Sequence, residues 1–374
     1  MSKLDRLIAE LCPYGVEYSI LGNITSITRG VRVVRSQLSE KGKYPVYQNS
    51  MTPLGYFEES NCKADTVFII SAGAAGEIGF SYVDYWVADD CFRFACPKQL
   101  QDRFLYYSLL CQQDYLYSKV RKASVPRLAR NVIEQMKIPL PPLPIQKEIV
   151  KILDNFTELS AELSAELSAE LSARQKQYKY YRNSLLTFGN SVSMMPLVDI
   201  AQNLDRRRRP VTKEHRISGD YPYYGASGIV DYVKGYLFDG DYLLISEDGA
   251  NLLARATPIA FSACGKIWVN NHAHVLHFKT YVERRFAEIY LNSIDLSHYI
   301  SSAAQPKLNQ ENLNRILVPQ PAYAEQERIV AILDRFDALT TNITSGLPAE
   351  ITARQQQYEY YRNKLLTFKE VNPS

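Results

Sequence analysis

The chain repeats itself, and this repeat limits its possible folds more than any other feature does. Residues 174–188 read RQKQYKYYRNSLLTF and residues 354–368 read RQQQYEYYRNKLLTF, so 12 of 15 positions are identical at an offset of 180 residues. At the same offset, QKEIVKILDNF (146–156) matches QERIVAILDRF (326–336), and PRL (126–128) matches PKL (306–308). Because internal repeats mark repeated structural units, the 374 residues form two copies of one module, each with a variable globular head and a nearly identical tail.

Each tail is predicted to be a long helix. Residues 146–188 contain no proline or glycine, and as a helix they would span about 64 Å. Two sets of apolar residues keep the same phase 180 residues apart: Leu159, Leu163, Leu167 and Leu171 in copy one, and Leu339, Ile343, Leu347 and Ile351 in copy two. This shared phase in otherwise different sequences predicts that the two helices pack on each other. Gly346 and Pro348 predict a kink or break in the second helix.

The order of the segments predicts how the copies pair. If the copies are related by a pseudo-two-fold axis, the helices are antiparallel and the second helix returns the C-terminus to the first head. The N-terminal helix predicted at 4–11 would pack beside it. The predicted fold class is α+β, with two tandem α/β heads separated by an antiparallel helical pair, a coiled-coil spacer. We expect the first head at 1–143, spacer helix one at 144–188, the second head at 189–323, and spacer helix two with a C-terminal tail at 324–374.

Within the heads, β-branched and aromatic runs predict strands at 66–70, 242–245 and 266–269. Helices are predicted at 102–116 and 282–294. The N-terminus lacks the apolar run of a signal peptide, and no apolar run approaches the length that a membrane span needs. The six cysteines form no CxxC pair, which indicates reduced thiols in a cytoplasmic protein.

Motifs for catalysis are missing from the sequence. It holds no GxxxxGK[ST] phosphate loop, no PP(Y/F) turn typical of amino-methyltransferases and no E-x-K ending of a common nuclease centre. His272, His274 and His277 form the one metal-like cluster, but a polar strand edge or a phosphate-facing surface explains them better than zinc does. We therefore predict no catalytic residue and no metal site.

Basic residues gather in both heads despite a net charge of only +3. The first head carries Arg29, Arg32, Arg35, Lys41 and Lys43, and the second carries Arg206, Arg207, Arg208, Arg209 and Lys213. A charge run is usually a solvated face. Two clusters at matching points of a duplicated module instead favour contact with nucleic-acid phosphates.

A Tyr-Pro element follows each basic cluster. The candidate DNA-contacting residues there are Tyr47, Gln48, Asn49 and Ser50 in the first head and Tyr223, Tyr224 and Ser227 in the second. Gln and Asn can pair with adenine edges in the major groove, although a hairpin or turn closed by Tyr-Pro would explain the pattern as well. Further candidates near the repeated PRL and PKL motifs are Arg127, Lys307 and Asn309.

Taken together, these motifs resemble the specificity subunit of type I restriction–modification systems (HsdS). The resemblance covers nearly the whole chain. It rests on PLPPLPIQKEIVKILD and PQPAYAEQERIVAILD, on the paired RQ-QY-YYRN-LLTF tails, and on the SAEL tetrapeptides, which are like those of the branch with TAEL repeats. It implies that each head is a target recognition domain reading one half of a bipartite, asymmetric DNA site, and that the helical pair sets the gap.

The resemblance also implies partners. Two modification subunits (HsdM) would carry S-adenosylmethionine and methylate adenine N6, and two restriction subunits (HsdR) would add ATP- and Mg-dependent translocation and cleavage. The duplicated tails are candidate docking places for the modification subunits, with Tyr180, Arg182, Tyr360 and Arg362 lying off the apolar stripe. The residues also leave open a coiled-coil adaptor that binds proteins and no DNA.

Overall fold

The protein divides into two compact units. Each unit contains the head of one sequence repeat and the helical tail of the other repeat. The computed structural model describes residues 2–255, 257–301, 306–340 and 346–371. Unit one comprises residues 1–167 and 350–374, and unit two comprises residues 168–349. Each unit therefore holds one head, the beginning of that copy's spacer helix and the tail of the other copy.

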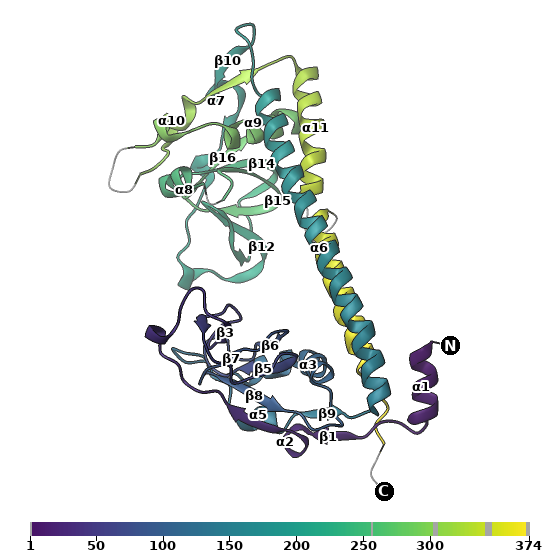
Figure 1. Ribbon diagram of the computed structural model, residues 1–374. Helices are drawn as coiled ribbons and strands as arrows, with labels where there is room; N and C mark the ends of the chain where they lie inside the picture. Colours follow the sequence, from purple (N-terminus) through teal and green to yellow (C-terminus); the bar gives the residue numbers. More distant parts are fainter. Residues whose placement is uncertain (1, 256, 302–305, 341–345, 372–374) are drawn as a thin grey trace. The chain divides into compact units, whose positions relative to one another are not determined.

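The head of unit one is built from short strands (Figure 1). A four-stranded sheet has the order β2-β8-β5-β6, and a three-stranded sheet has the order β4-β3-β7. Their bounds are β2 (Ser26–Arg29), β3 (Tyr44–Tyr47), β4 (Gly55–Phe57), β5 (Thr66–Ile70), β6 (Ile78–Ser81), β7 (Trp86–Val87) and β8 (Cys91–Ala95). Strand β1 (Tyr18–Ile20) pairs with β9 (Lys137–Pro139). The helices are α1 (Lys3–Leu11), α2 (Leu21–Ile24), α3 (Asp102–Leu110), α4 (Gln113–Lys119) and α5 (Arg130–Glu134).

The described residues of the second head form one six-stranded sheet in the order β11-β16-β14-β15-β12-β13. The strands are β11 (Gln202–Asn203), β12 (Ser218–Gly225), β13 (Gly228–Val233), β14 (Phe238–Ser246), β15 (Ala260–Val269) and β16 (Ala273–His277). Strand β10 (Ser193–Pro196) pairs with β17 (Leu317–Gln320). The helices are α7 (Leu197–Ile200), α8 (Gly249–Ala254), α9 (Tyr281–Ser293) and α10 (Gln310–Asn314).

The two heads share one strand order. If β6 and β7 are joined, the first head becomes β2-β8-β5-β6/β7-β3-β4, which matches β11-β16-β14-β15-β12-β13 strand for strand. Strand β15 runs for 10 residues without interruption, whereas residues 82–85 separate β6 from β7. In this interruption Asp84 accepts the Ala64 N–H at 2.8 Å. The strands predicted at 66–70, 242–245 and 266–269 lie within β5, β14 and β15, and the helix predicted at 282–294 matches α9 to within one residue at each end. The single helix predicted at 102–116 is wrong, because Cys111 and Gln112 form a turn that separates α3 from α4.

The spacer begins as part of each core. Helix α6 (Leu143–Leu185) is 43 residues long, and its residues Ile145, Ile149 and Leu153 belong to the apolar core of the first head. Helix α11 (Tyr323–Thr340) contributes Ile329 and Leu333 to the core of the second head in the same way. The predicted break in the second helix is confirmed, because α11 ends at Thr340 and a separate helix, α12 (Leu347–Leu365), begins at Leu347.

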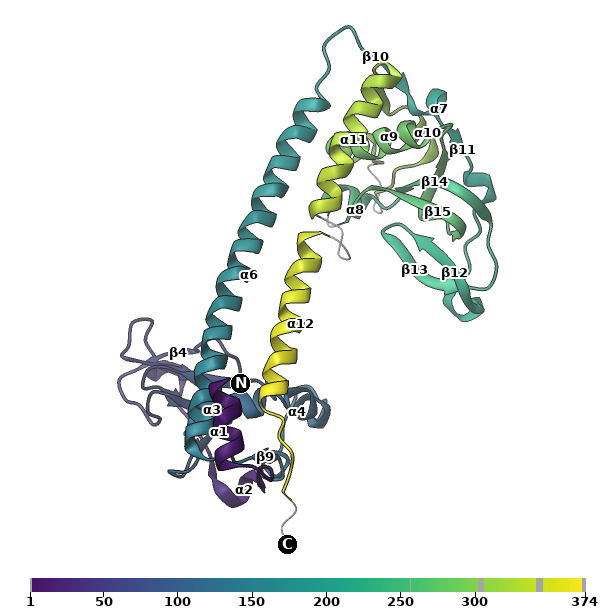
Figure 2. The same cartoon turned by 90° about the vertical axis from the view of Figure 1, so that its right-hand side faces the viewer.

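The tails close the opposite heads (Figures 1 and 2). In unit one, α12 runs antiparallel to the start of α6: the Tyr361 ring stacks on Phe156 at 6.1 Å, and the Tyr358 hydroxyl lies 2.9 Å from the hydroxyl of Thr157. Beyond α12, Leu366 is buried in the first head's core, to which Leu4 of α1 also belongs. The predicted return of the C-terminus to the first head is therefore confirmed.

Unit two repeats this arrangement with the end of α6. The rings of Tyr178 and Tyr181 lie 6.3 and 5.6 Å from Phe336 of α11. Leu186 and Phe188 pack against the second head's core. Burial raises the pKa of Tyr178 to about 12. The apolar residues of the tail thus serve packing, as their stripe predicts.

An arginine–aspartate pair joins head to spacer in each unit. Arg103 Nε of α3 donates to Asp154 Oδ1 at 2.8 Å, and Arg285 Nε of α9 donates to Asp334 Oδ1 at 2.7 Å. These aspartates are the D of the repeated ILD motif. Arg285 also binds Asp337 and Glu288, whose pKa values burial raises.

The predicted stripe of the spacer needs correction at two places. Leu167 is buried and Leu163, Leu171, Leu347 and Ile351 are half-buried. Leu159 and Leu339, however, are 63% and 49% exposed, so the prediction that they pack in the spacer is wrong. A four-residue repeat drifts by about 40° per step around a helix of 3.6 residues per turn, so the first leucine has turned away from the seam. Ile343 lies outside the described residues.

Candidate nucleic-acid interface

Backbone hydrogen bonds gather five segments at one end of the first head's sheets. We call residues 29–32, 47–50, 71–75, 88–90 and 126–128 the first loop end. The bonds that join them are Val31 N–H to Val87 O, Ala88 N–H to Tyr47 O, Ser71 N–H to Asp90 O, Ala74 N–H to Asn49 O, Gly73 N–H to Pro126 O and Leu128 N–H to Ser71 O, at 2.7–3.1 Å. The PRL motif is thus a strap over the loop that follows the central strand β5.

The second head builds the same end. We call residues 207–210, 224–228, 247–249, 270–272 and 306–309 the second loop end. The corresponding bonds are Arg209 N–H to Val269 O, Asn270 N–H to Tyr224 O, Glu247 N–H to His272 O, Gly249 N–H to Pro306 O and Leu308 N–H to Glu247 O, at 2.8–3.3 Å. The PKL motif therefore has the same structural position as PRL, which explains their 180-residue offset.

Exposed cations border the first loop end. Arg29, Arg32, Arg35 and Arg127 are exposed, and none of them forms an ion pair with another residue in the described ranges. The Arg29 guanidinium lies 6.0 Å from the centre of the Phe92 ring. Lys41 and Lys43 are exposed too, but they precede β3 and so lie at the opposite end of that strand. Arg29, Arg32 and Arg127 thus lie in segments of the first loop end and Arg35 follows three residues later, whereas these two lysines lie apart.

The polar residues after β3 differ in what they offer a ligand. Tyr47 packs its ring against Phe68 at 4.8 Å, and burial raises its pKa. Gln48 donates to Asp90 Oδ2 at 3.2 Å, and the Ser50 hydroxyl donates to Thr52 O at 2.9 Å. Asn49 is exposed at the tip. Of this set, Asn49 is best placed to contact a base edge.

The second head's arginines have three different environments. Arg206 and Arg209 are exposed, as is Lys213. Arg207 is exposed but donates to Leu237 O at 2.7 Å, with its guanidinium 4.8 Å from the Phe238 ring centre. Arg208 is turned inward, where it binds Glu247 at 3.1 Å and the Ala273 carbonyl at 2.8 Å. The prediction of a phosphate contact by Arg208 is therefore wrong, because internal carbonyl and carboxylate oxygens occupy its donors.

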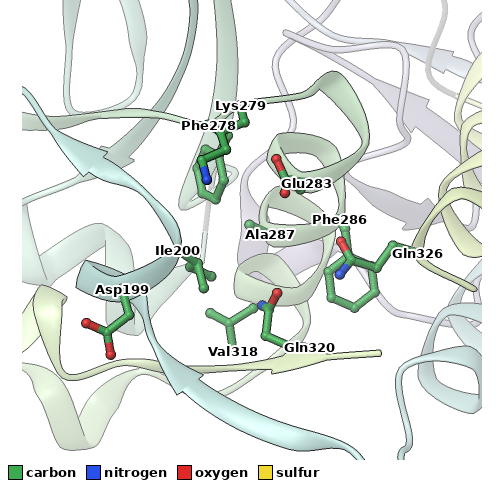
Figure 3. Close-up of a pocket in the computed structure, with 10 residues that line it drawn as sticks. All are labelled: Asp199, Ile200, Phe278, Lys279, Glu283, Phe286, Ala287, Val318, Gln320 and Gln326. Atoms are coloured by element: carbon green, nitrogen blue, oxygen red, sulfur yellow. The ribbon is translucent and has the colours of Figure 1, made fainter. Parts of the chain in front are cut away.

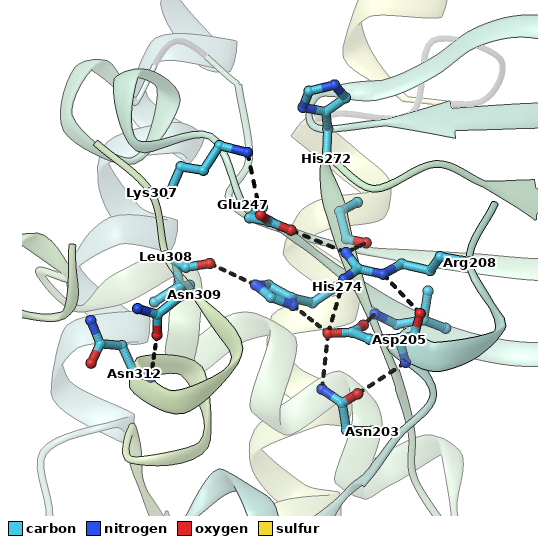
Figure 4. A network of polar contacts seen from close by, with 12 residues as sticks. Asn203, Asp205, Arg208, Glu247, His272, His274, Lys307, Leu308, Asn309 and Asn312 are labelled. Carbon is cyan, nitrogen blue, oxygen red and sulfur yellow. Dashed lines mark hydrogen bonds and ion pairs between the residues drawn. The ribbon is translucent and has the colours of Figure 1, made fainter. Parts of the chain in front are cut away.

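Arg208 belongs to a buried polar network beneath the second loop end (Figure 4). His274 lies between Asp205 Oδ2 at 2.6 Å and the Leu308 carbonyl at 2.7 Å. Asp205 also accepts the Val275 N–H at 2.8 Å. Burial alone would raise the pKa of Asp205, but these bonds and Arg208 lower it below its ordinary value. Within the described ranges, no group of His, Cys, Asp and Glu side chains could hold a metal ion.

The PKL strap contacts this network through Lys307 and Leu308. Lys307 Nζ lies 3.4 Å from Glu247 Oε1. Asn309 caps α10, because its side chain accepts the Asn312 N–H at 2.8 Å. The side-chain oxygen of Asn309 thus has a helix-capping role, which is common for asparagine at this position. Asn309 is exposed, and its contact with DNA stays a prediction.

The Tyr-Pro element of the second head also needs correction. Tyr223 is 1% exposed, and its hydroxyl accepts the Val211 N–H at 2.9 Å, so it cannot touch a base. Tyr224 is half-buried against the Phe261 ring at 6.1 Å. Ser227 is exposed in the turn between β12 and β13. The element is a strand in both heads, in which Val46 and Tyr223 are buried and Tyr47 and Tyr224 are half-buried.

Trp86 and Trp268, the two tryptophans of the chain, are not among the predicted site residues. Each donates its indole N–H to a carbonyl of the basic segment, to Val31 O and to Arg209 O respectively, at 2.7 Å in both heads. The dipeptide Trp-Val at 86–87 and at 268–269 was the signal that could have identified them.

A small cavity lies elsewhere in the second head (Figure 3). Its lining comes from α7, α9, β17, α11 and the residues between β16 and α9, and it includes Asp199, Lys279, Glu283 and Gln326. The Gln326 amide donates to Pro321 O at 3.1 Å, so this side chain fixes the start of α11. No residue of the second loop end lines the cavity, so it forms no part of the candidate interface.

The candidate docking residues of the tails occupy equivalent positions. Tyr180 is 69% exposed and Tyr360 is 59% exposed. Arg182 lies 5.9 Å from the ring centre of Tyr178, and Arg362 lies 5.8 Å from that of Tyr358. Both tails therefore present the same exposed tyrosine beside the same half-buried arginine.

The fold and the twice-built loop end define a class of protein with two homologous recognition heads joined by a helical spacer. The family model described as "Type I restriction modification DNA specificity domain" matches the chain twice, at residues 13–173 and 191–353. The chain therefore belongs to this family.

Curated relatives of the chain are specificity subunits of the same family. The chain is 41% identical over 188 residues to a putative type I restriction enzyme specificity subunit of Haemophilus influenzae, covering 49% of this chain and 48% of the relative. It is 33% identical over 255 residues to the EcoprrI specificity subunit of Escherichia coli, covering 65% of this chain and 62% of the relative. The matched region thus spans about half to three fifths of these relatives' lengths.

Solved structures share the fold. A chain from a study of complex assembly and conformational transition of the type I restriction–modification system matches with a TM-score of 0.65 at 14% identity, covering 95% of this chain and 98% of that one. The S subunit of Mycoplasma genitalium matches with a TM-score of 0.54 at 16% identity, covering 94% of this chain and 96% of that one. At these identities the likeness concerns the fold alone.

Proposed function

We propose that this chain is the DNA sequence-specificity subunit of a type I restriction–modification complex. Each head reads one half of a bipartite, asymmetric site, and the spacer sets the gap between the halves. The observation that carries this is the loop end built twice, each time with exposed arginines that can neutralise phosphates next to side chains that can reach base edges. Family membership of both modules supports the same conclusion.

The chemistry belongs to partners in this proposal. Two modification subunits bring S-adenosylmethionine and methylate adenine N6, and two restriction subunits bring ATP and Mg for translocation and cleavage, all in the cytoplasm of a prokaryote. The chain itself contributes recognition and geometry and has no catalytic step of its own. Among the described residues, no helix combines the length and apolar character that crossing a membrane requires.

Two equivalent partners need two equivalent docking places, and the tails supply them. Tyr180 with Arg182, and Tyr360 with Arg362, repeat one motif of an exposed tyrosine and a half-buried arginine in both units. Exposed aromatic and arginine side chains are typical anchors of protein interfaces. We propose that each pair contacts one modification subunit. The variant Tyr180→Ala with Tyr360→Ala should lower co-purification of the modification subunit, and unchanged co-purification would refute the assignment.

The deciding experiment maps methylated adenines across the genome with and without this chain. A bipartite motif that disappears when the chain is deleted supports the proposal. The competing adaptor function predicts no change in methylation sites. It also predicts that retention on DNA-cellulose does not depend on Arg206 and Arg209, so that the variant with Arg206→Ala and Arg209→Ala behaves as the wild type does. Loss of DNA retention in that variant, with normal assembly, excludes the adaptor.

A further inference from the structure

The two tryptophans fix one residue of each basic segment from both sides. In the first head Val31 donates its N–H to Val87 O at 2.9 Å, and its carbonyl accepts the Trp86 indole N–H at 2.7 Å. In the second head Arg209 donates its N–H to Val269 O at 3.3 Å, and its carbonyl accepts the Trp268 indole at 2.7 Å. The same two-point clamp is therefore built twice on unlike sequences.

Each tryptophan stands at the same point of its sheet. Trp86 pairs with Val46 in the parallel ladder of β7 and β3, and Trp268 pairs with Tyr223 in the parallel ladder of β15 and β12. An aromatic ring supports each indole: Phe57 lies 5.0 Å from Trp86, and Tyr223 lies 6.5 Å from Trp268. The donor that holds the basic segment is thus part of the rigid sheet, although the segment itself is a loop.

The clamped residues lie among the exposed cations of each loop end. Arg29, Arg32 and Arg35 fall within four positions of Val31, while Arg207 and Lys213 fall within four positions of Arg209. A single-turn 3-10 helix follows at the same distance in both heads, beginning at Arg35 and at Lys213. Fixing one carbonyl therefore restricts the backbone that carries several phosphate-binding candidates.

We propose that Trp86 and Trp268 are positioning residues, which hold the basic segments in the conformation that contacts DNA phosphates. This rests on the proposed DNA-reading function and adds residues that touch no DNA themselves. A cationic loop that is already ordered loses less conformational entropy on binding, so its contacts yield more affinity. Without the indole N–H the segment loses one of its two fixed points, and the phosphate contacts form at a greater entropic cost.

The test measures salt dependence of binding to a duplex of random sequence. Because log Kd changes linearly with log salt in proportion to the number of phosphates neutralised, the slope counts the contacts in place. Full-length Trp86→Phe and Trp268→Phe keep an aromatic ring and remove the N–H. We expect each slope to fall by about one unit and affinity near 0.1 M salt to fall about 3- to 10-fold. The double variant should lose about two units.

The matched control is Tyr82→Phe, which removes a polar group from an exposed aromatic residue just ahead of Trp86. Its slope should equal that of the wild type. Replacing both tryptophans by benzothienylalanine provides a second, gentler variant, because sulfur replaces N–H and the ring keeps its size. A lower slope with an unchanged melting temperature supports the positioning role.

Two other outcomes refute different statements. If the wild-type chain binds duplex DNA and the indole variants keep its slope, the tryptophans serve packing alone and the inference is wrong. If the wild-type chain shows no salt-dependent binding to any duplex, the proposed function itself fails, and the variants need not be compared.

Discussion

The two heads share a scaffold and differ in the chemistry placed on it. In the first head, Arg29 of β2 pairs with Phe92 of β8. In the second head, the pairing of β11 with β16 continues past Asn203 and brings Asp205 beside His274. At this shared position the first head carries an exposed arginine over a ring, and the second carries a buried carboxylate bonded to an imidazole at 2.6 Å. The strands, straps and tryptophan clamps remain alike.

The straps of the two heads also differ in whether their basic residue is paired. Arg127 of PRL is exposed and makes no ion pair within the described residues, whereas Lys307 of PKL lies 3.4 Å from Glu247. The residue equivalent to Glu247 in the first head is Ser71, as the shared strap bonds show. At the strap, the second head therefore pairs internally the cation that the first head presents to solvent. Backbone bonds fix the shape of a loop end and leave its side chains free to diverge.

The spacer helices differ as well, and this difference should give the largest effect. Helix α6 is unbroken over its tetrapeptides, while the second spacer is divided into α11 and α12. Deleting Ser160–Leu163 shortens α6 by about 6 Å. We expect every methylated site to change its gap and keep both half-site sequences. Glu162→Gln, which preserves length, should leave the sites unchanged. Altered half-site bases in the methylation map would contradict the spacer's role.

The buried network of the second head should give the next largest effect. Asp205→Ala leaves His274 and Arg208 without their shared carboxylate, and removing one partner of a buried pair costs about 3 kcal/mol of unfolding free energy. Arg29→Ala, at the corresponding place of the first head, should cost at most about 0.5 kcal/mol because that side chain is exposed.

Urea unfolding can separate the two heads. Trp86→Phe leaves Trp268 as the fluorescent reporter of the second head, and Trp268→Phe leaves Trp86 as that of the first. Equal losses of unfolding free energy in Asp205→Ala and Arg29→Ala would contradict the comparison. The buried carboxylate of the second head would then stabilise its head no more than the exposed arginine stabilises the first.

The Asp205 carboxylate should also make the stability of the second head depend on pH. Its bonds lower the pKa of Asp205 in the folded state, so the ionised form is favoured by folding. The stabilisation is therefore complete above the unfolded pKa of about 3.9 and is lost as pH falls through the lower folded value. The stability difference between wild type and Asp205→Asn should be constant from about pH 7 to 5 and shrink below about pH 4. A difference that grows on acidification would contradict this sign.

Local repetition made the spacer predictable, and long-range contacts made much of the interface unpredictable. The helices and the break near Gly346 follow from periodicity, glycine and proline, which act over a few residues. The antiparallel pairing follows from the pseudo-two-fold relation of the two copies. The inward turn of Arg208 depends on Glu247, and the burial of Tyr223 depends on the fold around Val211. A run of four arginines gives no sign of which one a distant carboxylate will bind.

The straps supply the smallest and sharpest test of the comparison. Arg127→Ala should lower the slope of log Kd against log salt by about one unit, because an unpaired cation is free to release a counterion from DNA. Lys307→Ala should lower it by clearly less, since Glu247 already neutralises that charge in the free protein. Glu247→Gln removes the competing carboxylate, so Lys307→Ala made in that background should then match Arg127→Ala. Equal slopes for the two single variants would show that the Lys307–Glu247 pair opens on DNA and that both straps contact phosphate.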